Sequence, residues 1–332
     1  MLSTVGGPRK ASYLCFLALI ACAAALHLGP MVLAGLFSYL LLDMSHRRLS
    51  QAMRPFYARW TSCAIFLVAG SAIGWVFWEF LRQALSSMPR IVANALPKVI
   101  EMTDHYGFDL PFETLEQVRE AFLAAVKENA LAVTRMTGLY TKRFFHVLAG
   151  VIIAVLCFFG ESEPARGASL YDVLRAEVHD RFRTFMLSFE KVFGAQIIIS
   201  GINTTITAIF LATAGIPHMA FLVPATFILG LLPLIGGILS NTLIVSSALT
   251  VSPSMASIAL IFLIVIHKAE YFLNSRIVGG SIDSPMWLTL IGILVGELIM
   301  GVPGIILAPA ILHYIRVELQ AIPAPPHESR PL

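Results

Sequence analysis

The sequence predicts an all-α, polytopic membrane protein with about eight transmembrane or half-membrane helices, some of them broken by Gly and Pro. Of its 332 residues, 57% are apolar and 13% are charged, whereas roughly 25% of the residues in soluble domains are charged. The charges are also unevenly distributed, because residues 192–315 contain five of them. So apolar a stretch has too few charged side chains to form a surface exposed to water, and we therefore place it in lipid.

This composition excludes an ordinary soluble enzyme, a disordered chain and a disulfide scaffold. The sequence contains no GxxxxGK[ST], HExxH or GxSxG motif, and its nine histidines lack metal-ligand spacing. We therefore expect no enzymatic activity, cofactor or metal. The net charge of +3 is too small to indicate a nucleic-acid partner.

The first membrane segment is predicted at 11–42, where two apolar runs are separated by Gly29-Pro30. A kinked span and a tight hairpin of short helices both fit its length, and the hairpin is preferred. The arginine-rich loop 43–59 and the basic amino terminus are both expected in the cytoplasm, because short basic loops stay inside. Residues 61–81 then cross outward and complete a first region, 1–81.

The next two regions are predicted to be amphipathic. Residues 82–143 carry eight basic and seven acidic side chains and show helical apolar spacing, which indicates an extracytoplasmic helical region. Residues 144–160 return to the cytoplasm, and 161–191 form an amphipathic helix there, which together make the region 144–191. A core region follows at 192–316, in which 192–214 cross once more, and a flexible tail is predicted at 317–332.

Two long apolar stretches of this core are interrupted near their centres. Pro233 and Gly236 interrupt segment 217–250, and a Gly/Pro cluster interrupts segment 286–315, at Gly301, Pro303, Gly304 and Pro309. Each stretch fits either one kinked span or two half-length helices. Broken helices leave backbone dipoles that bind ions, and a pair of broken segments indicates a transporter's binding site. The alternative is two proline kinks that only shape packing.

Six polar side chains are further candidates for a substrate or ion pathway. Glu297 is the most informative, because a carboxylate inside an apolar run costs about 2.5–3.5 kcal/mol to insert. It is expected to bind a cation, a proton or a polar solute, unless it lies at the membrane surface. The other candidates are Gln196, Asn203, Asn241, Glu270 and Arg276. For the three amides, hydrogen bonding between helices is the alternative role.

Several motifs of the core resemble those of the autoinducer-2 exporter (AI-2E) family of bacterial membrane proteins. The similar elements are Gly194-Ala-Gln196, Gly230-Leu-Leu-Pro233-Leu-Ile-Gly236-Gly237, Glu270-Tyr-Phe-Leu-Asn274-Ser-Arg276-Ile-Val-Gly279-Gly-Ser281, and Gly296-Glu-Leu-Ile-Met-Gly301-Val-Pro-Gly304 followed by Ala308-Pro309. The layout of the segments agrees over nearly the whole chain. Departures from the family pattern occur at Gly230, Leu234, Gly237, Ser275, Glu297 and Pro303.

The resemblance implies an ATP-independent transporter, multi-pass in the bacterial inner membrane, that exports a small polar solute or signalling molecule. It also implies a homo-oligomer in the lipid bilayer. A sodium/proton antiporter that uses Glu297 is one alternative, with coupling to protons or sodium ions. A non-transporting membrane scaffold that docks a partner on 82–143 is the other.

Overall fold

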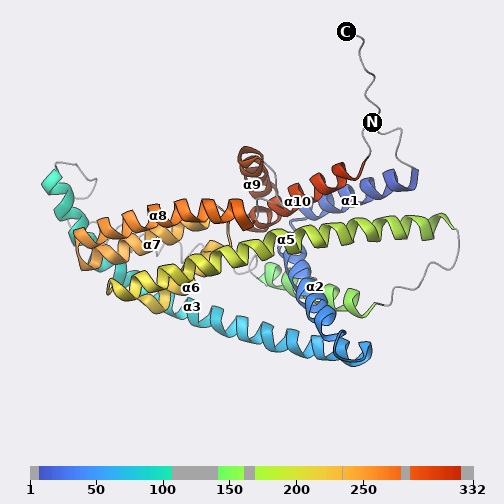
Figure 1. Cartoon of the computed structure of the whole chain (residues 1–332), viewed down its shortest axis with the longest axis horizontal. Coiled ribbons are helices and arrows are strands. Elements are labelled where there is room, and N and C mark those ends of the chain that lie inside the picture. Colours follow the sequence, from blue (N-terminus) through green and yellow to red (C-terminus); the bar gives the residue numbers. More distant parts are fainter. Residues whose placement is uncertain (1–6, 107–140, 161–168, 234, 278–284, 323–332) are drawn as a thin grey trace, which may run out of the picture. The chain divides into compact units, whose positions relative to one another are not determined.

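The computed structural model describes residues 7–106, 141–160, 169–233, 235–277 and 285–322 (Figure 1). These residues form two compact units, each described by itself. The first unit comprises Met1–Leu67, Arg143–Gly194 and Ser281–Leu332, and the second comprises Val68–Lys142 and Ala195–Gly280. The helices are α1 (Gly7–Ala25), α2 (Gly29–Leu49), α3 (Pro55–Tyr106), Thr141–Phe159, α5 (Leu170–Thr213), α6 (Met219–Gly230), α7 (Ile235–Val251), α8 (Pro253–Ile277), α9 (Met286–Met300) and α10 (Val302–Gln320).

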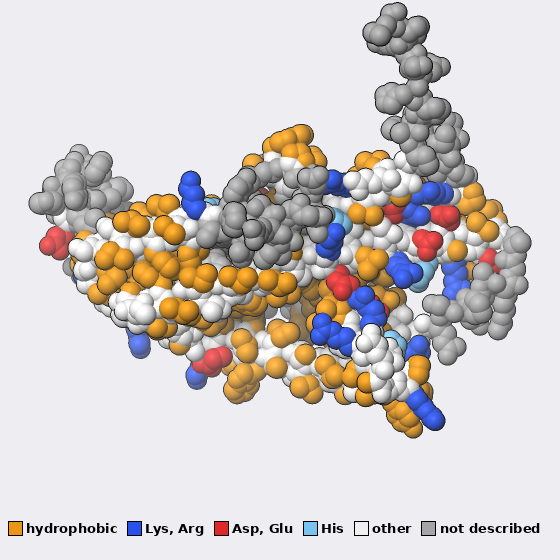
Figure 2. Space-filling view, viewed as in Figure 1, with side chains coloured by type: hydrophobic (Ala, Val, Ile, Leu, Met, Phe, Trp, Pro, Cys, Tyr) orange, Lys and Arg blue, Asp and Glu red, His pale blue; other side chains and the backbone are white. Residues whose placement is uncertain are grey.

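The predicted fold class is confirmed, since the described part of the chain is all-helical and strongly apolar. Five of its helices are long and apolar enough to cross a membrane: Gly7–Ala25, Pro55–Val99, Thr141–Phe159, Leu170–Thr213 and Val302–Gln320. Shorter apolar helices lie between them in the sequence. Figure 2 shows many hydrophobic side chains on the surface of the molecule, and on α8 Ile261 and Val265 are each more than 60% exposed.

The amino-terminal segment forms two helices rather than one kinked span. The break lies at Leu26-His27-Leu28, where His27 has a φ of 54°, and Pro30 occupies the first turn of α2, a position that tolerates proline. The loop predicted at 43–59 is shorter than expected, because α2 continues to Leu49. The Asp43–Arg47 ion pair, four residues apart, lies on this polar end of α2, and the chain leaves the helix at Ser50.

Two predicted boundaries inside long helices are absent from the structure. The span predicted at 61–81 belongs to α3, which continues without a break to Tyr106. Likewise, the amphipathic helix predicted at 161–191 and the crossing at 192–214 form one helix, α5. Charge content changes along both helices, but a change from apolar to polar residues does not by itself end a helix, and α3 also continues through Pro89 and Pro97. The amphipathic helix expected around 114–126 lies outside the described residues.

The first unit is built around an aromatic core between α2, α5 and α10. Phe189 is fully buried, and its ring stacks on Phe193 and meets Phe37 edge to face, with centroids 5.8 and 5.0 Å apart. The remaining buried members are Leu36, Leu40, Phe185, Met186, Leu307, Ala310 and Tyr314. At its edge, the Arg47 guanidinium donates to Glu190 (2.7 Å), and this hydrogen bond raises the pKa of Arg47.

The second unit packs α6, α7 and α8 against parts of α3 and α5. Its core contains Ile91, Leu211, Ile216, Phe221, Leu222, Ala225, Ile244, Ala248, Ala259 and Leu263. Phe210 of α5 stacks on Phe262 of α8 with ring centroids 3.9 Å apart. At one end of α7, the ammonium group of Lys98 donates to the carbonyls of Thr250 and Val251, both at 2.6 Å. This contact satisfies the carbonyl end of α7 with a cation, as the helix dipole favours.

Both interrupted stretches are helical hairpins, so the structure chooses between the two arrangements that the sequence leaves open. In 217–250, the hydroxyl of Ser247 donates to the carbonyl of Pro217 (3.0 Å), which places the end of α7 beside the start of α6. In 286–315, Gly296 of α9 lies against the backbone of Gly304, and Gly292 lies against Leu312. α6 with α7, and α9 with α10, therefore run antiparallel.

The adjacent glycines at the start of α7 give a matched test of the first hairpin. A Cβ on Gly236 would collide with the carbonyl of Leu229, whereas a Cβ on Gly237 would meet nothing within 4 Å. We expect Gly236→Ala to lower the free energy of unfolding by about 1–3 kcal/mol through steric conflict. Gly237→Ala is the control and should be neutral or stabilising, because alanine favours helix by about 1 kcal/mol. Equal effects in denaturant titrations would contradict the hairpin contact.

Candidate transport site

The break between α6 and α7 is closed by two side chains from α5. Gln196 donates its amide Nε2 to the carbonyl of Gly230 (2.6 Å), and Ser200 donates its hydroxyl to the carbonyl of Phe227 (2.8 Å). The turn itself satisfies the two carbonyls between them, since Leu231 N bonds Ile228 O at 3.3 Å and Leu232 N bonds Leu229 O at 2.8 Å. All of the last four carbonyls of α6, which a helix end leaves open, therefore have protein donors.

The amide dipoles at this break are thus occupied in the described conformation. A solute would reach the carbonyls of α6 only by displacing the side chains of Gln196 and Ser200. Gln196 therefore lies at the predicted site, where it binds the backbone carbonyl of Gly230 at the end of α6. Pro233 lies in the turn that follows, and Gly236 permits the close approach of α7 to α6.

The other two amides predicted for the site lie further along the same elements. Asn203 is half-buried on α5, and its Oδ1 accepts a hydrogen bond from the Thr207 hydroxyl (3.4 Å). Asn241 is half-buried on α7. The contact of Asn203 lies within one helix, so it does not join two helices.

The break between α9 and α10 is a turn through Gly301. This glycine has a φ of 66°, which L side chains rarely adopt, and its carbonyl accepts the N–H groups of Gly304 (2.9 Å) and Ile305 (3.2 Å). Pro303 has no N–H to satisfy. Of the first four residues of α10, Pro303, Gly304 and Ile305 therefore have no unpaired backbone N–H. The N–H of Val302 is the remaining donor of this turn. Pro309 lies inside α10.

Glu297 lies on the last turn of α9, four residues before the glycine turn. Its side chain is exposed on the surface of the described first unit, and its backbone carbonyl accepts from Gly301 N (2.7 Å). The neighbouring Leu298 is 86% exposed and Val302 is 55% exposed. A carboxylate is therefore placed at the hairpin tip among side chains that favour lipid or an apolar partner.

The two predicted breaks belong to different units, with Pro233 in the second and Pro303 in the first. Their meeting inside the bilayer stays a prediction. Glu270 and Arg276 both lie in α8, and their side chains are outside the described residues.

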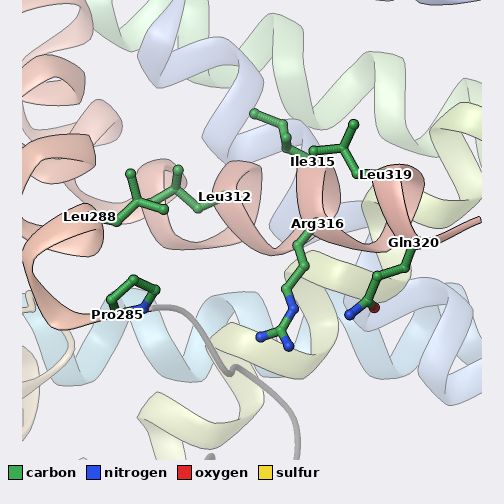
Figure 3. Close-up of a pocket in the computed structure, with 7 residues that line it drawn as sticks. All are labelled: Pro285, Leu288, Leu312, Ile315, Arg316, Leu319 and Gln320. Atoms are coloured by element: carbon green, nitrogen blue, oxygen red, sulfur yellow. The ribbon is translucent and has the colours of Figure 1, made fainter. Parts of the chain in front are cut away.

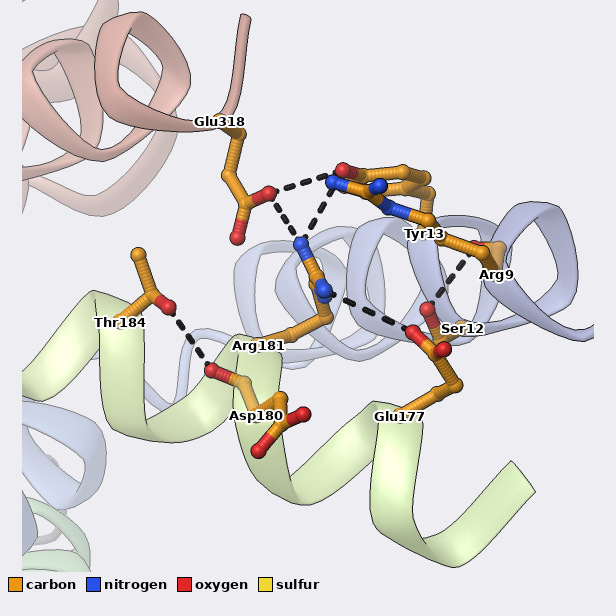
Figure 4. Close-up of polar contacts among 8 residues, drawn as sticks. All are labelled: Arg9, Ser12, Tyr13, Glu177, Asp180, Arg181, Thr184 and Glu318. Atoms are coloured by element: carbon orange, nitrogen blue, oxygen red, sulfur yellow. Dashed lines mark hydrogen bonds and ion pairs between the residues drawn. The ribbon is translucent and has the colours of Figure 1, made fainter. Parts of the chain in front are cut away.

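A buried polar cluster of the first unit joins α1, α5 and α10 (Figure 4). The guanidinium of Arg181 donates to Glu318, and both side chains are nearly buried, at 10% and 7% exposure. The hydroxyl of Tyr13 donates to the same carboxylate (2.8 Å) and accepts from Arg181 (3.1 Å). Arg181 also lies 5.0 Å from the centroid of the Tyr13 ring. Glu177 lies at the edge of the cluster, 3.5 Å from Arg181.

This polar cluster links α1 and α10, which lie near the two ends of the sequence, to α5. A buried ion pair adds little net stability, because desolvation opposes the attraction, yet removing one partner leaves an uncompensated charge. Arg181 and Glu318 therefore fix α1, α5 and α10 in one register. Any movement of α10 against α5 in the transport cycle must open this pair.

Sequence reasoning missed this cluster because it treated 317–332 as a tail. α10 continues to Gln320, since no Gly or Pro occurs between Pro309 and Pro323. The signal was present in the spacing of Leu307, Ala310, Tyr314 and Glu318, which follows the helical period and places the carboxylate on the buried face. Within the described ranges, no three His, Cys, Asp or Glu side chains gather so as to hold a metal ion.

Comparison with known proteins assigns the chain to a family. The family described as AI-2E family transporter matches residues 11–324. This chain belongs to the AI-2E transporter family. Over 133 residues it is also 29% identical to the "Putative transport protein YdbI" of Bacillus subtilis (strain 168), a match that covers 40% of this chain and 38% of that protein.

Membership in the AI-2E family confirms the resemblance seen in the core motifs and the prediction of a multi-pass membrane transporter that is not an enzyme. The matched range includes both hairpins, Glu297 and the Arg181–Glu318 pair. The site residues are thus part of the AI-2E region itself.

The polar cluster predicts an asymmetric response to single substitutions. Glu318→Ala should lower the free energy of unfolding by about 3–5 kcal/mol, because it leaves Arg181 buried without its carboxylate. Glu177→Ala is the matched control and should change it by less than about 1 kcal/mol, since this outer pair is longer and more exposed. Unfolding of the purified protein by SDS in mixed micelles measures both.

A double variant separates the charge from the packing. Arg181→Met combined with Glu318→Leu should recover most of the stability lost in Glu318→Ala, because similar apolar volume replaces the pair without a buried charge. A double variant as unstable as the single one would contradict the account.

Proposed function

We propose that this AI-2E family member is an ATP-independent secondary transporter that exports a small polar solute from the bacterial cytoplasm. The observation that carries the proposal is the pair of Gly/Pro-broken hairpins, α6–α7 and α9–α10. Paired broken segments are the sequence feature that points best to a transporter's binding site. Family membership supports transport itself.

The lengths of α6 and α9, one helix from each hairpin, support re-entrant elements. α6 has 12 residues and α9 has 15, so they extend roughly 18 and 22 Å at 1.5 Å per residue, short of the ~30 Å hydrocarbon core. Non-helical backbone at membrane depth is tolerated where protein or a water-filled cavity surrounds it. The internal capping of the α6 end by Gln196 and Ser200 meets this requirement.

The carbonyls at the end of α6 are the groups proposed to contact the solute in the second unit. Glu297 supplies a charge at one hairpin tip. The carbonyls of Phe227 and Gly230 become available when α5 withdraws Gln196 and Ser200. Exchange of these donors for a polar solute would keep the backbone satisfied in both states, as lipid requires.

The orientation follows from the charges near the membrane helices. Arg47, Arg48 and Arg54 lie at the end of α2 and in the short turn before α3, and Arg9 and Lys10 lie in the first turn of α1. Short basic segments stay in the cytoplasm, so we place the amino terminus inside, in a bacterial inner-membrane protein. A homo-oligomer is part of the proposal through the family resemblance.

A sodium/proton antiporter is the second candidate, and the position of Glu297 favours it. Glu297 is a carboxylate at a hairpin tip among apolar side chains, and an ionisable residue in such a segment can bind a cation or a proton. A pH-sensitive dye in vesicles given a sodium gradient separates the two functions. Loss of exchange in Glu297→Gln, with solute efflux absent, would favour the antiporter.

Reconstituted efflux tests the proposed exporter. Proteoliposomes loaded with autoinducer-2 should release it without ATP, and the double variant Pro233→Ala, Pro303→Ala should release it at least tenfold more slowly. Each substitution restores a backbone N–H at a break, in the turn before α7 and in the first turn of α10, and so adds a donor where the native chain has none.

The control is Pro253→Ala, since Pro253 opens α8 away from both hairpin turns. Reconstitution is normalised to monodisperse protein recovered from the vesicles. Unchanged efflux in the double variant would exclude the breaks from the pathway, and absent efflux in the unaltered protein would exclude this solute.

A further inference from the structure

The hairpin of α9 and α10 carries an outward groove that the proposed transport site does not use. The groove encloses about 390 Å³ and is lined by Pro285, Leu288, Leu312, Ile315, Arg316, Leu319 and Gln320 (Figure 3). All of these residues belong to the first unit. The wall is aliphatic, and its polar groups are a guanidinium and an amide.

The groove lies on the side of α10 that faces away from the core. Leu312, Ile315 and Leu319 follow the helical period, with Arg316 and Gln320 beside them on the same stripe. Ile315 is 45% exposed and Leu319 is 62% exposed, whereas Tyr314 and Glu318 are buried on the opposite side. One face of α10 is thus buried in the first unit, and another face is exposed.

The polar groups of the groove gather at one end of the hairpin. Figure 3 shows the side chains of Arg316 and Gln320 extending in the same direction from the last turns of α10. Because α9 and α10 are antiparallel, this end also carries the first turn of α9, with Trp287 at 63% exposure. Tryptophan and arginine at the end of an apolar helix mark the membrane–water interface. The groove therefore opens at the depth of lipid headgroups and extends toward the hydrocarbon.

We infer that this groove binds one anionic phospholipid. Its phosphate would accept hydrogen bonds from the guanidinium of Arg316 and the amide of Gln320, and an acyl chain would lie along Leu312, Ile315 and Leu319. Guanidinium matches phosphate geometry, and basic pockets between membrane helices bind anionic headgroups. An acyl chain gains little free energy on moving from the surrounding lipid to the aliphatic walls of the groove. The charged end therefore determines the preference for anionic over zwitterionic lipid.

Quenching of Trp287, which precedes the groove residue Leu288, by brominated lipids reports lipid bound beside the first turn of α9. Trp60, Trp75 and Trp78 are replaced by Phe in the full-length protein, which leaves Trp287 as the reporter among the four tryptophans. The protein is reconstituted in dioleoylphosphatidylcholine containing increasing amounts of dibrominated phosphatidylglycerol or dibrominated phosphatidylcholine. Phosphatidylglycerol should bind about fivefold more tightly, as expected for one arginine near the surface.

Two charge variants assign the preference to the groove. Arg316→Gln should bring the ratio of the two lipids to about one. Arg175→Gln, which removes an equally charged but more exposed side chain from α5, should leave the ratio unchanged. Quenching by brominated phosphatidylcholine reports that the region around Trp287 is folded in every variant.

The outcomes are decisive in each direction. A ratio near one in the starting protein, or a ratio that Arg316→Gln leaves intact, would overturn the site. Displacement of bound phosphatidylglycerol by oleate at lower concentration would overturn the phospholipid assignment in favour of a free fatty acid. Glycerol 1-phosphate should not displace the lipid, because it lacks the chain that the groove holds.

Discussion

Every backbone N–H and C=O of this chain that lies in lipid requires a partner within the protein, and this constraint governs the two places where its core helices break. At the end of α6, Gln196 and Ser200 of α5 bind two carbonyls and the following turn binds two more. At the start of α10, the carbonyl of Gly301 accepts two amides, and Pro303 removes another donor. At the α6 break, side chains of α5 bind the carbonyls. At the start of α10, the Gly301 carbonyl and the missing N–H of Pro303 reduce the number of unpaired donors.

This difference assigns different roles to the hairpins. The α6 break depends on α5, so a shift of α5 would open carbonyls to a polar solute. In the α9–α10 turn the carbonyl of Gly301 binds the N–H groups of Gly304 and Ile305, and the proposed contribution of this hairpin is the charge of Glu297 at the tip. The Arg181–Glu318 pair, together with Tyr13, links α10 to α1 and α5 by groups that are costly to separate singly. The pair therefore holds the three helices in the arrangement that the structure describes.

The sequence was sufficient to predict the fold class, the membrane core and both interruptions. Low charge over 192–315 and the prolines at 233 and 303 are strong local signals, because lipid excludes charge and proline ends helices. It could not predict whether each interruption is a kink or a hairpin, since that depends on contacts such as Gly296 with Gly304. Nor did it predict the partner of Gln196 or the burial of Glu318, which depend on the helix that packs alongside.

The account depends most on the claim that each interrupted segment turns back inside the bilayer. Single cysteines at Gly215 and Ser252, which flank α6–α7, and at Pro285 and Ala321, which flank α9–α10, test it in a protein whose native cysteines are replaced by serine. A membrane-impermeant maleimide applied from one side should label both members of each set from the same side. Labelling of the two members from opposite sides would show a kinked span and contradict the account.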